Sequence, residues 1–233
     1  MDTLINALKG AIELISSSNP QLLEIVGLTL QVAGTGLLVA ILIGLPLGVW
    51  IGLSRRIPGA GWLMPLIYTG MGFPPVVVGL FVYLLLSNSG PFGNLQWLFS
   101  PMAMISAQAI IGLPLVLGLT IAALQSLEPK LQLQLRSLGA TKWQLAWTML
   151  AEARFGIFAA IVAAFGSIIS EVGAVMLVGG NIAGETRVLT TAIVLETGKG
   201  NFSLAIALGL ILLGIAFVTN IAFFSFQRNG INK

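Results

Sequence analysis

Long apolar stretches alternate with short polar segments along this chain. Five of the stretches reach the roughly 20 apolar residues that a helix needs to cross a bilayer; they cover residues 25–53, 62–86, 101–124, 155–178 and 202–226. Their apolar residues follow one another without the alternation that a membrane β-barrel strand requires. The pattern therefore predicts an all-α integral membrane protein of five transmembrane helices, with a single transmembrane domain over residues 25–226.

The polar segment 125–154 interrupts this pattern and is too long for a tight turn between two membrane helices. Its residues Leu131, Leu135, Leu138 and Leu145 recur at helical spacing, which predicts an apolar stripe, and Gly139 divides the segment into two short helices. Such a segment is expected to touch something outside the membrane. The residue pattern leaves two interpretations open: a partner protein docks on it, or it lies on the lipid headgroups.

Two shorter pieces flank the transmembrane domain. Residues 1–24 predict an amphipathic helix at the outer membrane interface, because the apolar side chains in its first 15 residues fall on one helical face. Residues 227–233 form a short cytoplasmic tail. Between the last two spans, the sequence from Thr186 to Glu196 predicts a short helix at the outer surface.

The Lys and Arg residues predict the orientation in the membrane, since cytoplasmic segments are enriched in both. With the amino terminus outside and the carboxyl terminus in the cytoplasm, the inner segments hold eight of the eleven basic residues: Arg55, Arg56, Lys130, Arg136, Lys142, Arg154, Arg228 and Lys233. The outer segments hold Lys9, Arg187 and Lys199. The segment 125–154 is therefore expected in the cytoplasm.

The composition argues against catalysis by this chain. It contains no Cys and no His, so we expect no metal site, and most nucleophilic and zinc-dependent chemistry is excluded. No GxxxxGK[ST] motif is present. If ATP and Mg²⁺ drive this protein, another chain must bind them. We expect lipid and protein partners, and no nucleic acid.

The cytoplasmic segment contains a recognisable motif. Arg136-Ser137-Leu138-Gly139-Ala140-Thr141 resembles the RxLGAS core of the cytoplasmic loop in permease subunits of ABC importers. The motif departs from the family at Leu133-Gln134-Leu135, where Glu-Ala-Ala is usual, and at Glu152, where Pro is usual. The resemblance implies a type I ABC importer permease-like bundle with a coupling-helix loop. It further implies two copies of this chain, two ATPase subunits and an extracytoplasmic binding protein. The residues implied to dock on the ATPase are Arg136, Ser137, Leu138, Gly139, Ala140, Thr141, Lys142 and Trp143.

A second stretch narrows the resemblance. The segments 170–182, 186–193 and 196–202 look like those of tungstate permeases, whose relatives carry molybdate and sulfate. The implied function is import of an oxyanion, tungstate in the first place and molybdate or sulfate as alternatives, across a prokaryotic cytoplasmic membrane. The resemblance also implies that the outer loop residues Asn181, Thr186, Arg187 and Lys199 face the binding protein. A self-contained channel or secondary transporter is the alternative from a different class.

Polar residues inside the predicted spans are candidates for a pore or gate. Glu171 is the one carboxylate within a span; it either pairs with a cation such as Arg187 in a closed gate or holds the end of its span by hydrogen bonds. Ser170, Ser167, Thr69 and Gln108 either line a path or join helices. Finally, the small residues Gly34, Gly36, Gly44 and Gly48 of the first span are expected to permit close helix packing. Gly44 and Gly48 form a GxxxG pair, which is by itself weak evidence for a dimer face.

Overall fold

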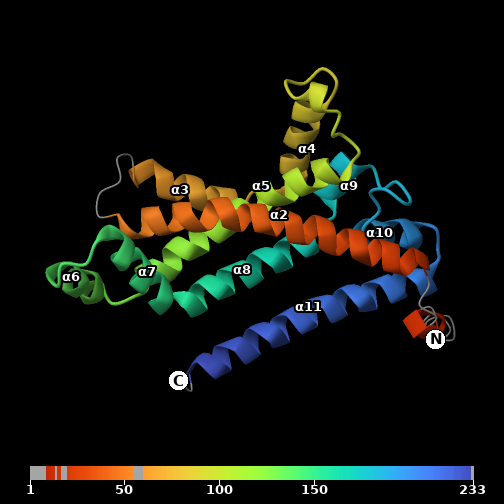
Figure 1. Cartoon of the computed structure of the whole chain (residues 1–233). Coiled ribbons are helices and arrows are strands. Elements are labelled where there is room, and N and C mark those ends of the chain that lie inside the picture. The colour runs from red at the N-terminus through yellow and green to blue at the C-terminus, as the bar shows by residue number, and fades with distance from the viewer. Residues whose placement is uncertain (1–8, 14, 17–19, 55–59, 232–233) are drawn as a thin grey trace.

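The computed structural model describes residues 9–13, 15–16, 20–54 and 60–231, and the regular structure among them is helical (Figure 1). The all-α prediction is confirmed. The elements are α2 (Pro20–Leu53), α3 (Ala60–Met71), α4 (Pro75–Leu86), η1 (Gly93–Leu95), α5 (Pro101–Gln125), α6 (Pro129–Ser137), α7 (Lys142–Glu152), α8 (Arg154–Ile169), α9 (Gly173–Gly179), α10 (Leu189–Gly198) and α11 (Phe202–Ile231).

By length and composition, the described ranges hold three candidate membrane spans, or up to five. The helices α2, α5 and α11 are each long and apolar enough to cross a bilayer, and two bent pairs raise the number to five if each pair counts as one span. These pairs are α3 with α4, bent by 97°, and α7 with α8, bent by 70°.

The predicted spans 62–86 and 155–178 are each divided in two. The first breaks at residues 72–74, because Pro75 has no N–H to continue the helix of α3 and Pro74 restricts the residue before it. The second stops at Ile169 and resumes at Gly173. There the Glu171 carboxylate accepts a hydrogen bond from the N–H of Ala174 at 2.8 Å and so begins α9.

Both ends of the predicted domain also differ. Helix α2 begins at Pro20, since proline is favoured in the first turn of a helix, so residues 20–24 belong to the first span. Of the predicted interfacial helix, residues 9–13 are helical, while residues 1–8, 14 and 17–19 lie outside the described residues. The predicted stop at Arg55 and Arg56 lies outside them too. Helix α11 continues to Ile231 and includes most of the predicted tail.

Helices α2 and α5 lie side by side through the middle of the molecule (Figure 1). Gly36 and Gly48 of α2 allow this approach, because a Cβ atom on them would come within 2.6 Å of Gln108 Cβ and 2.9 Å of Thr120 Cβ, respectively. The predicted role of Gly44 and Gly48 in close helix packing is confirmed, and their partner is α5 of the same chain rather than a second copy.

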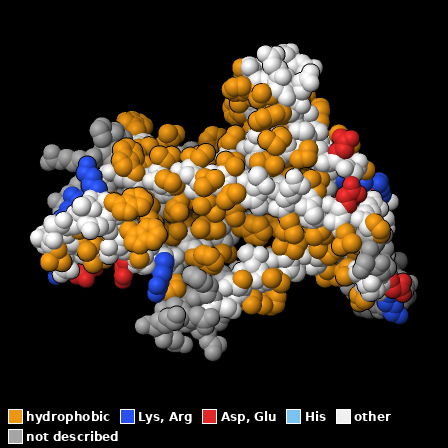
Figure 2. Space-filling model, in the orientation of Figure 1, with side chains coloured by type: hydrophobic (Ala, Val, Ile, Leu, Met, Phe, Trp, Pro, Cys, Tyr) orange, Lys and Arg blue, Asp and Glu red, His pale blue; other side chains and the backbone are white. Residues whose placement is uncertain are grey.

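The charged side chains gather at the two ends of the long axis, and the middle is covered by hydrophobic side chains (Figure 2). The segment predicted to be cytoplasmic (the cytoplasmic loop), which contains α6 and α7, lies at one end (Figure 1). Helix α10, in the predicted outer loop, lies at the other end with the start of α11 (Figure 1). This distribution places the membrane across the middle of the bundle.

Candidate functional site

The cytoplasmic loop is built from two short helices joined by a tight turn. Helix α6 ends where the N–H of Ala140 bonds to Leu135 O at 3.0 Å and the N–H of Gly139 bonds to Arg136 O at 3.1 Å. This arrangement requires the left-handed backbone of Gly139, whose φ is +81°. The predicted break at Gly139 is confirmed.

A capping box begins the second helix of the loop. The Thr141 hydroxyl accepts a hydrogen bond from the N–H of Gln144 at 3.3 Å, and the Gln144 side chain accepts one from the N–H of Thr141 at 2.9 Å. These reciprocal bonds satisfy two amides at the amino-terminal end of α7. They fix the direction in which α7 leaves the turn.

One face of the loop is bound to the membrane helices. Leu145 and Met149 of α7 are buried against Leu124 of α5, and Leu131 and Leu135 pack on the same cluster. The amide of Gln132 also donates to Leu53 O at the end of α2, at 2.9 Å. The loop is therefore fastened to α2, α5 and α8, and we expect it to move with them.

The other face of the loop exposes large apolar side chains. Leu138 is 83% exposed, Trp143 is 77% exposed and Trp147 is 65% exposed. Leu138 therefore lies at the exposed turn beside Gly139 and does not pack with Leu131, Leu135 and Leu145 of the predicted apolar stripe. Exposed apolar groups next to the exposed Arg136 and Lys142 are typical of a surface that binds another protein.

The pore and gate candidates occupy different surroundings. Ser167, Ser170 and Thr69 are exposed, while Gln108 is 3% exposed and packs beside Gly36 of α2. The Ser170 hydroxyl donates to Gly166 O of its own helix at 2.7 Å. The five candidates do not form a single cluster in this conformation, and their role stays a prediction.

Helix α8 presents an exposed stripe of small residues. They lie on one helical face, which continues to the capping residue Ser170, and are Gly156, Ala159, Ala163, Gly166, Ser167 and Ser170. By contrast, α11 exposes large side chains such as Leu213 and Phe217, which are 68% and 67% exposed. Large apolar groups suit lipid, whereas small and hydroxyl-bearing groups suit a close protein contact or a polar path.

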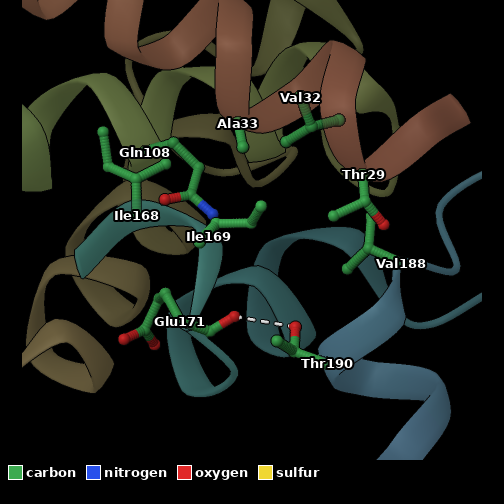
Figure 3. A pocket seen from close by; sticks show the side chains of 9 residues that line it. All are labelled: Thr29, Val32, Ala33, Gln108, Ile168, Ile169, Glu171, Val188 and Thr190. Carbon is green, nitrogen blue, oxygen red and sulfur yellow. Dashed lines mark hydrogen bonds between the residues drawn. The ribbon is translucent and has the colours of Figure 1, made fainter. Parts of the chain in front are cut away.

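Glu171 acts as a helix cap in this structure. Besides the bond from its side chain to Ala174 N–H, its backbone carbonyl accepts a hydrogen bond from the Thr190 hydroxyl at 2.9 Å (Figure 3). Within the part of the chain that the structure describes, no ion pair joins Glu171 to Arg187. The hydrogen-bonding role is therefore the one seen here.

A small cavity of about 10 Å³ lies beside this break, between α2, α5 and the end of α8. Gln108, Glu171 and Thr190 line it together with apolar residues such as Ile168 and Ile169 (Figure 3). The Gln108 carbonyl oxygen is buried and has no hydrogen-bond partner in the protein. A volume of this size holds about one water molecule.

The outer loop is held together by its own polar residues. Thr186 is fully buried; its hydroxyl donates to Gly179 O at 2.5 Å and accepts from the N–H of Ile182 at 2.9 Å. Arg187 is half-buried and donates to Asn181 O at 3.4 Å. Thr186 therefore supports the loop from inside, and Asn181 and Arg187 are its partly accessible members.

Lys199 is engaged by a neighbouring carboxylate. Its ammonium group lies 2.9 Å from Glu196, whose other oxygen accepts a hydrogen bond from the Asn201 amide at 3.0 Å. The hydrogen bond from Lys199 lowers the pKa of the Glu196 carboxyl below its ordinary value, and the charge of Arg187 adds to the effect. This cluster fixes the turn between α10 and α11.

Sequence reasoning missed Thr29, Thr190 and Glu196. The Thr29 hydroxyl accepts a hydrogen bond from Leu189 N–H at 2.9 Å, although 160 positions separate the two residues. This bond ties the start of α10 to α2. A threonine within an apolar span was the available signal, but its partner could not be identified from the sequence.

Comparisons with known proteins agree with these features. Residues 44–229 match the family described as "Binding-protein-dependent transport system inner membrane component". The chain is 39% identical to a tungstate uptake system permease protein of Peptoclostridium acidaminophilum, over 98% of this chain and all of that protein. It is 42% identical to a probable anion ABC transporter permease protein of Haloferax volcanii, over 85% of this chain and 88% of that protein. The fold is similar to that of the inward-facing MetNI methionine ABC transporter, with a TM-score of 0.74, 18% identity, and coverage of 91% of this chain and 98% of that chain.

Proposed function

Because the chain belongs to the family of binding-protein-dependent transport system inner membrane components, the permease subunits of ABC importers, we propose that it carries tungstate into a prokaryotic cell. The observation behind the substrate is the identity to a tungstate uptake permease along almost the whole chain. The chain is the membrane-spanning, non-catalytic component of such a system. ATP and Mg²⁺ bind to a separate ATPase subunit, and an extracytoplasmic binding protein delivers the oxyanion.

In this proposal two copies of the chain form the path between them and two ATPase subunits bind in the cytoplasm. The amino terminus lies outside and the carboxyl terminus inside. The orientation is supported by the basic residues, which collect on the predicted cytoplasmic segments. The pairing of two copies is supported by α8, whose exposed stripe of small residues would be covered by a second copy or line a water-filled path.

The exposed face of the cytoplasmic loop is the proposed ATPase-docking surface. Leu138 and Trp143 offer apolar area at the turn, and Arg136 and Lys142 flank them with positive charge. Because the opposite face is packed against α5 and α8, a movement of the bound ATPase would shift these helices directly. The cytoplasmic loop would thus both bind the ATPase and transmit its movement to the membrane helices.

The outer loop is the proposed contact for the binding protein, through Asn181, Arg187 and Lys199. Ser167, Ser170 and Thr69 are exposed hydroxyl groups that we propose line the path, where they could donate hydrogen bonds to an oxyanion. Glu171 would repel a dianion, so we assign it to a gate or to helix capping.

The proposal is tested by ATP hydrolysis in the reconstituted complex with the binding protein loaded in turn with tungstate, molybdate and sulfate. We expect tungstate to stimulate hydrolysis at the lowest concentration. Stimulation by molybdate or sulfate instead would change the substrate. Uptake by the permease alone, without ATP or partners, would indicate a self-contained channel or secondary transporter and overturn the coupling scheme.

A further inference from the structure

Helix α4 and the loop after it form an arm, residues 75–100, that leaves the side of the bundle (Figure 1). The loop is folded back on the helix, because the N–H of Phe92 bonds to Leu85 O at 3.0 Å. The ring of Phe99 contacts the ring of Tyr83 edge to face, with 6.1 Å between the centroids. These contacts fix the loop against α4, so the surface between the arm and the bundle is preformed.

A cavity of about 250 Å³ lies between the arm and α5. Its lining residues include Leu85, Phe92, Trp97, Ser106 and Ile110. Among the described residues that line it, all are hydrophobic except Ser106, whose hydroxyl already donates to Met102 O of its own helix at 2.8 Å. A buried water needs two to four polar partners, and apolar cavities stay dry and bind apolar molecules instead. The cavity therefore suits a hydrocarbon ligand.

The surroundings of the cavity are uncharged and open to the outside. The sequence has no Lys, Arg, Asp or Glu between Ile57 and Leu127, a range that includes the whole arm and α5. At the mouth of the cavity Phe92 is 52% exposed and Ile110 is 47% exposed. Figure 2 shows hydrophobic side chains over the lower part of the arm, between the two charged ends of the molecule. The opening thus lies where the membrane surrounds the bundle.

Two observations favour lipid over a second copy of the chain at this opening. The exposed face of α4 carries large apolar side chains such as Phe81 and Leu84, which are 58% and 53% exposed. Small residues, which suit close contact between helices in a membrane, are instead exposed on α8. Helices α4 and α8 lie on different sides of α2 and α5 (Figure 1), so a second copy that covers α8 leaves the arm to the lipid.

We propose that this cavity binds one acyl chain of a membrane phospholipid, which lies in the outer leaflet in the orientation proposed above. The bound chain fills the space between the arm and α5 and stabilises the position of the arm. Asn88, Ser89 and Asn94 at the tip of the arm are exposed and uncharged, so they offer hydrogen bonds to a headgroup without selecting its charge. Recognition is therefore of the acyl chain.

Trp97 provides a fluorescent probe inside the cavity. The chain has five Trp residues, and the other four are first changed by Trp50→Phe, Trp62→Phe, Trp143→Phe and Trp147→Phe. The full-length permease is then reconstituted in phosphatidylcholine vesicles whose acyl chains carry bromine, which quenches tryptophan at close range. We expect the fluorescence of Trp97 to fall to less than half of its value in vesicles without bromine.

Variants of α5 distinguish a chain in the cavity from lipid around the protein. Ser106→Phe fills the cavity and should at least halve the quenching. Met102→Phe is the matched control, since Met102 is exposed one turn earlier on the same helix and does not line the cavity. Ile110→Ala enlarges the cavity and should increase the quenching, which decides the matter if Ser106→Phe fails to fold. Quenching that changes in neither cavity variant would overturn the proposal.

Two further outcomes would also overturn it. If brominated lipid does not quench Trp97, protein covers the cavity, as a second copy of the chain would. If brominated phosphatidylglycerol quenches Trp97 and brominated phosphatidylcholine does not, the site recognises a charged headgroup and not an acyl chain. We expect the two lipids to quench equally. None of these measurements requires transport, so a complex that imports no oxyanion would contradict the proposed function and leave the lipid site standing.

Discussion

Glu196 is 8% exposed and is held by Lys199 and Asn201. Its lowered pKa means that the ionised form stabilises the folded outer loop. A carboxyl with a depressed pKa stabilises the fold at pH values above its ordinary pKa, and this contribution is lost as the pH falls through the lowered value. The turn between α10 and α11 should therefore loosen in acid.

We predict that Glu196→Gln lowers the free energy of unfolding by about 1–2 kcal/mol at neutral pH, the range for hydrogen bonds to charged groups. The difference from the unchanged protein should shrink as the pH is lowered below about 4.5, the ordinary pKa of the group. Thermal unfolding of the purified protein from pH 3 to 8 measures this. Glu185→Gln, an exposed carboxylate of the same loop, is the control, and an equal effect there would contradict the assignment.

The left-handed backbone of Gly139 leads to a second prediction for a single residue. Its φ of +81° is strained by about 1–2 kcal/mol for a residue with a Cβ atom, although nothing lies within 4 Å of the Cβ position. Gly139→Val should therefore reorient the turn and reduce co-purification of the ATPase subunit. Gly139→Asn should retain it, because asparagine tolerates this conformation. If the Gly139→Val variant still co-purified with the ATPase subunit, the docking proposal would be contradicted.

At the scale of helices, the α2–α5 contact explains which glycines matter. A side chain at Gly36 would meet Gln108 of α5, whereas nothing lies within 4 Å of the Cβ position of Gly34. Both glycines look alike in the sequence as members of one apolar span. The structure distinguishes them because only one faces the neighbouring helix.

We predict that Gly36→Leu destabilises the protein by about 1–3 kcal/mol, the usual range for overpacking a core. Gly34→Leu, two positions away, should leave the melting temperature in detergent almost unchanged. Equal losses in the two variants would mean that α2 and α5 do not pack as described.

The helical elements also show what a sequence pattern can and cannot predict. Hydrophobic length predicted the positions of the membrane helices, and Gly139 predicted the break between α6 and α7, because both signals are local. The break before α4 also has a local signal in Pro74 and Pro75, but the size of the bend, 97°, could not be read from it. The partner of Gly48 in α5 and the hydrogen bond between Thr29 and Leu189 depend on distant contacts, so residue spacing could not identify them.

At the scale of the whole molecule, charge and hydrophobic surface describe a bundle that crosses the membrane along its long axis (Figure 2). The predicted orientation can be checked because the chain has no native Cys. Ser137 in the cytoplasmic loop and Glu185 in the outer loop are both exposed, so each position can carry a single introduced cysteine. A membrane-impermeant maleimide on intact cells should label Glu185→Cys and leave Ser137→Cys unlabelled. The reverse pattern would invert the topology.

Helix α5 packs against the cytoplasmic loop at one end and against α9 at the other. Leu124 packs against Leu145 of the cytoplasmic loop, and Met104 packs in the cluster that contains Val178 of α9. Its 25 residues span about 38 Å at 1.5 Å per residue. A rigid tilt of about 10° around the cytoplasmic end would carry the outer end sideways by about 7 Å, slightly more than the pitch of one helical turn. A small rotation of the docking surface, passed on through α5, would therefore become a large sideways displacement at the opposite side of the membrane.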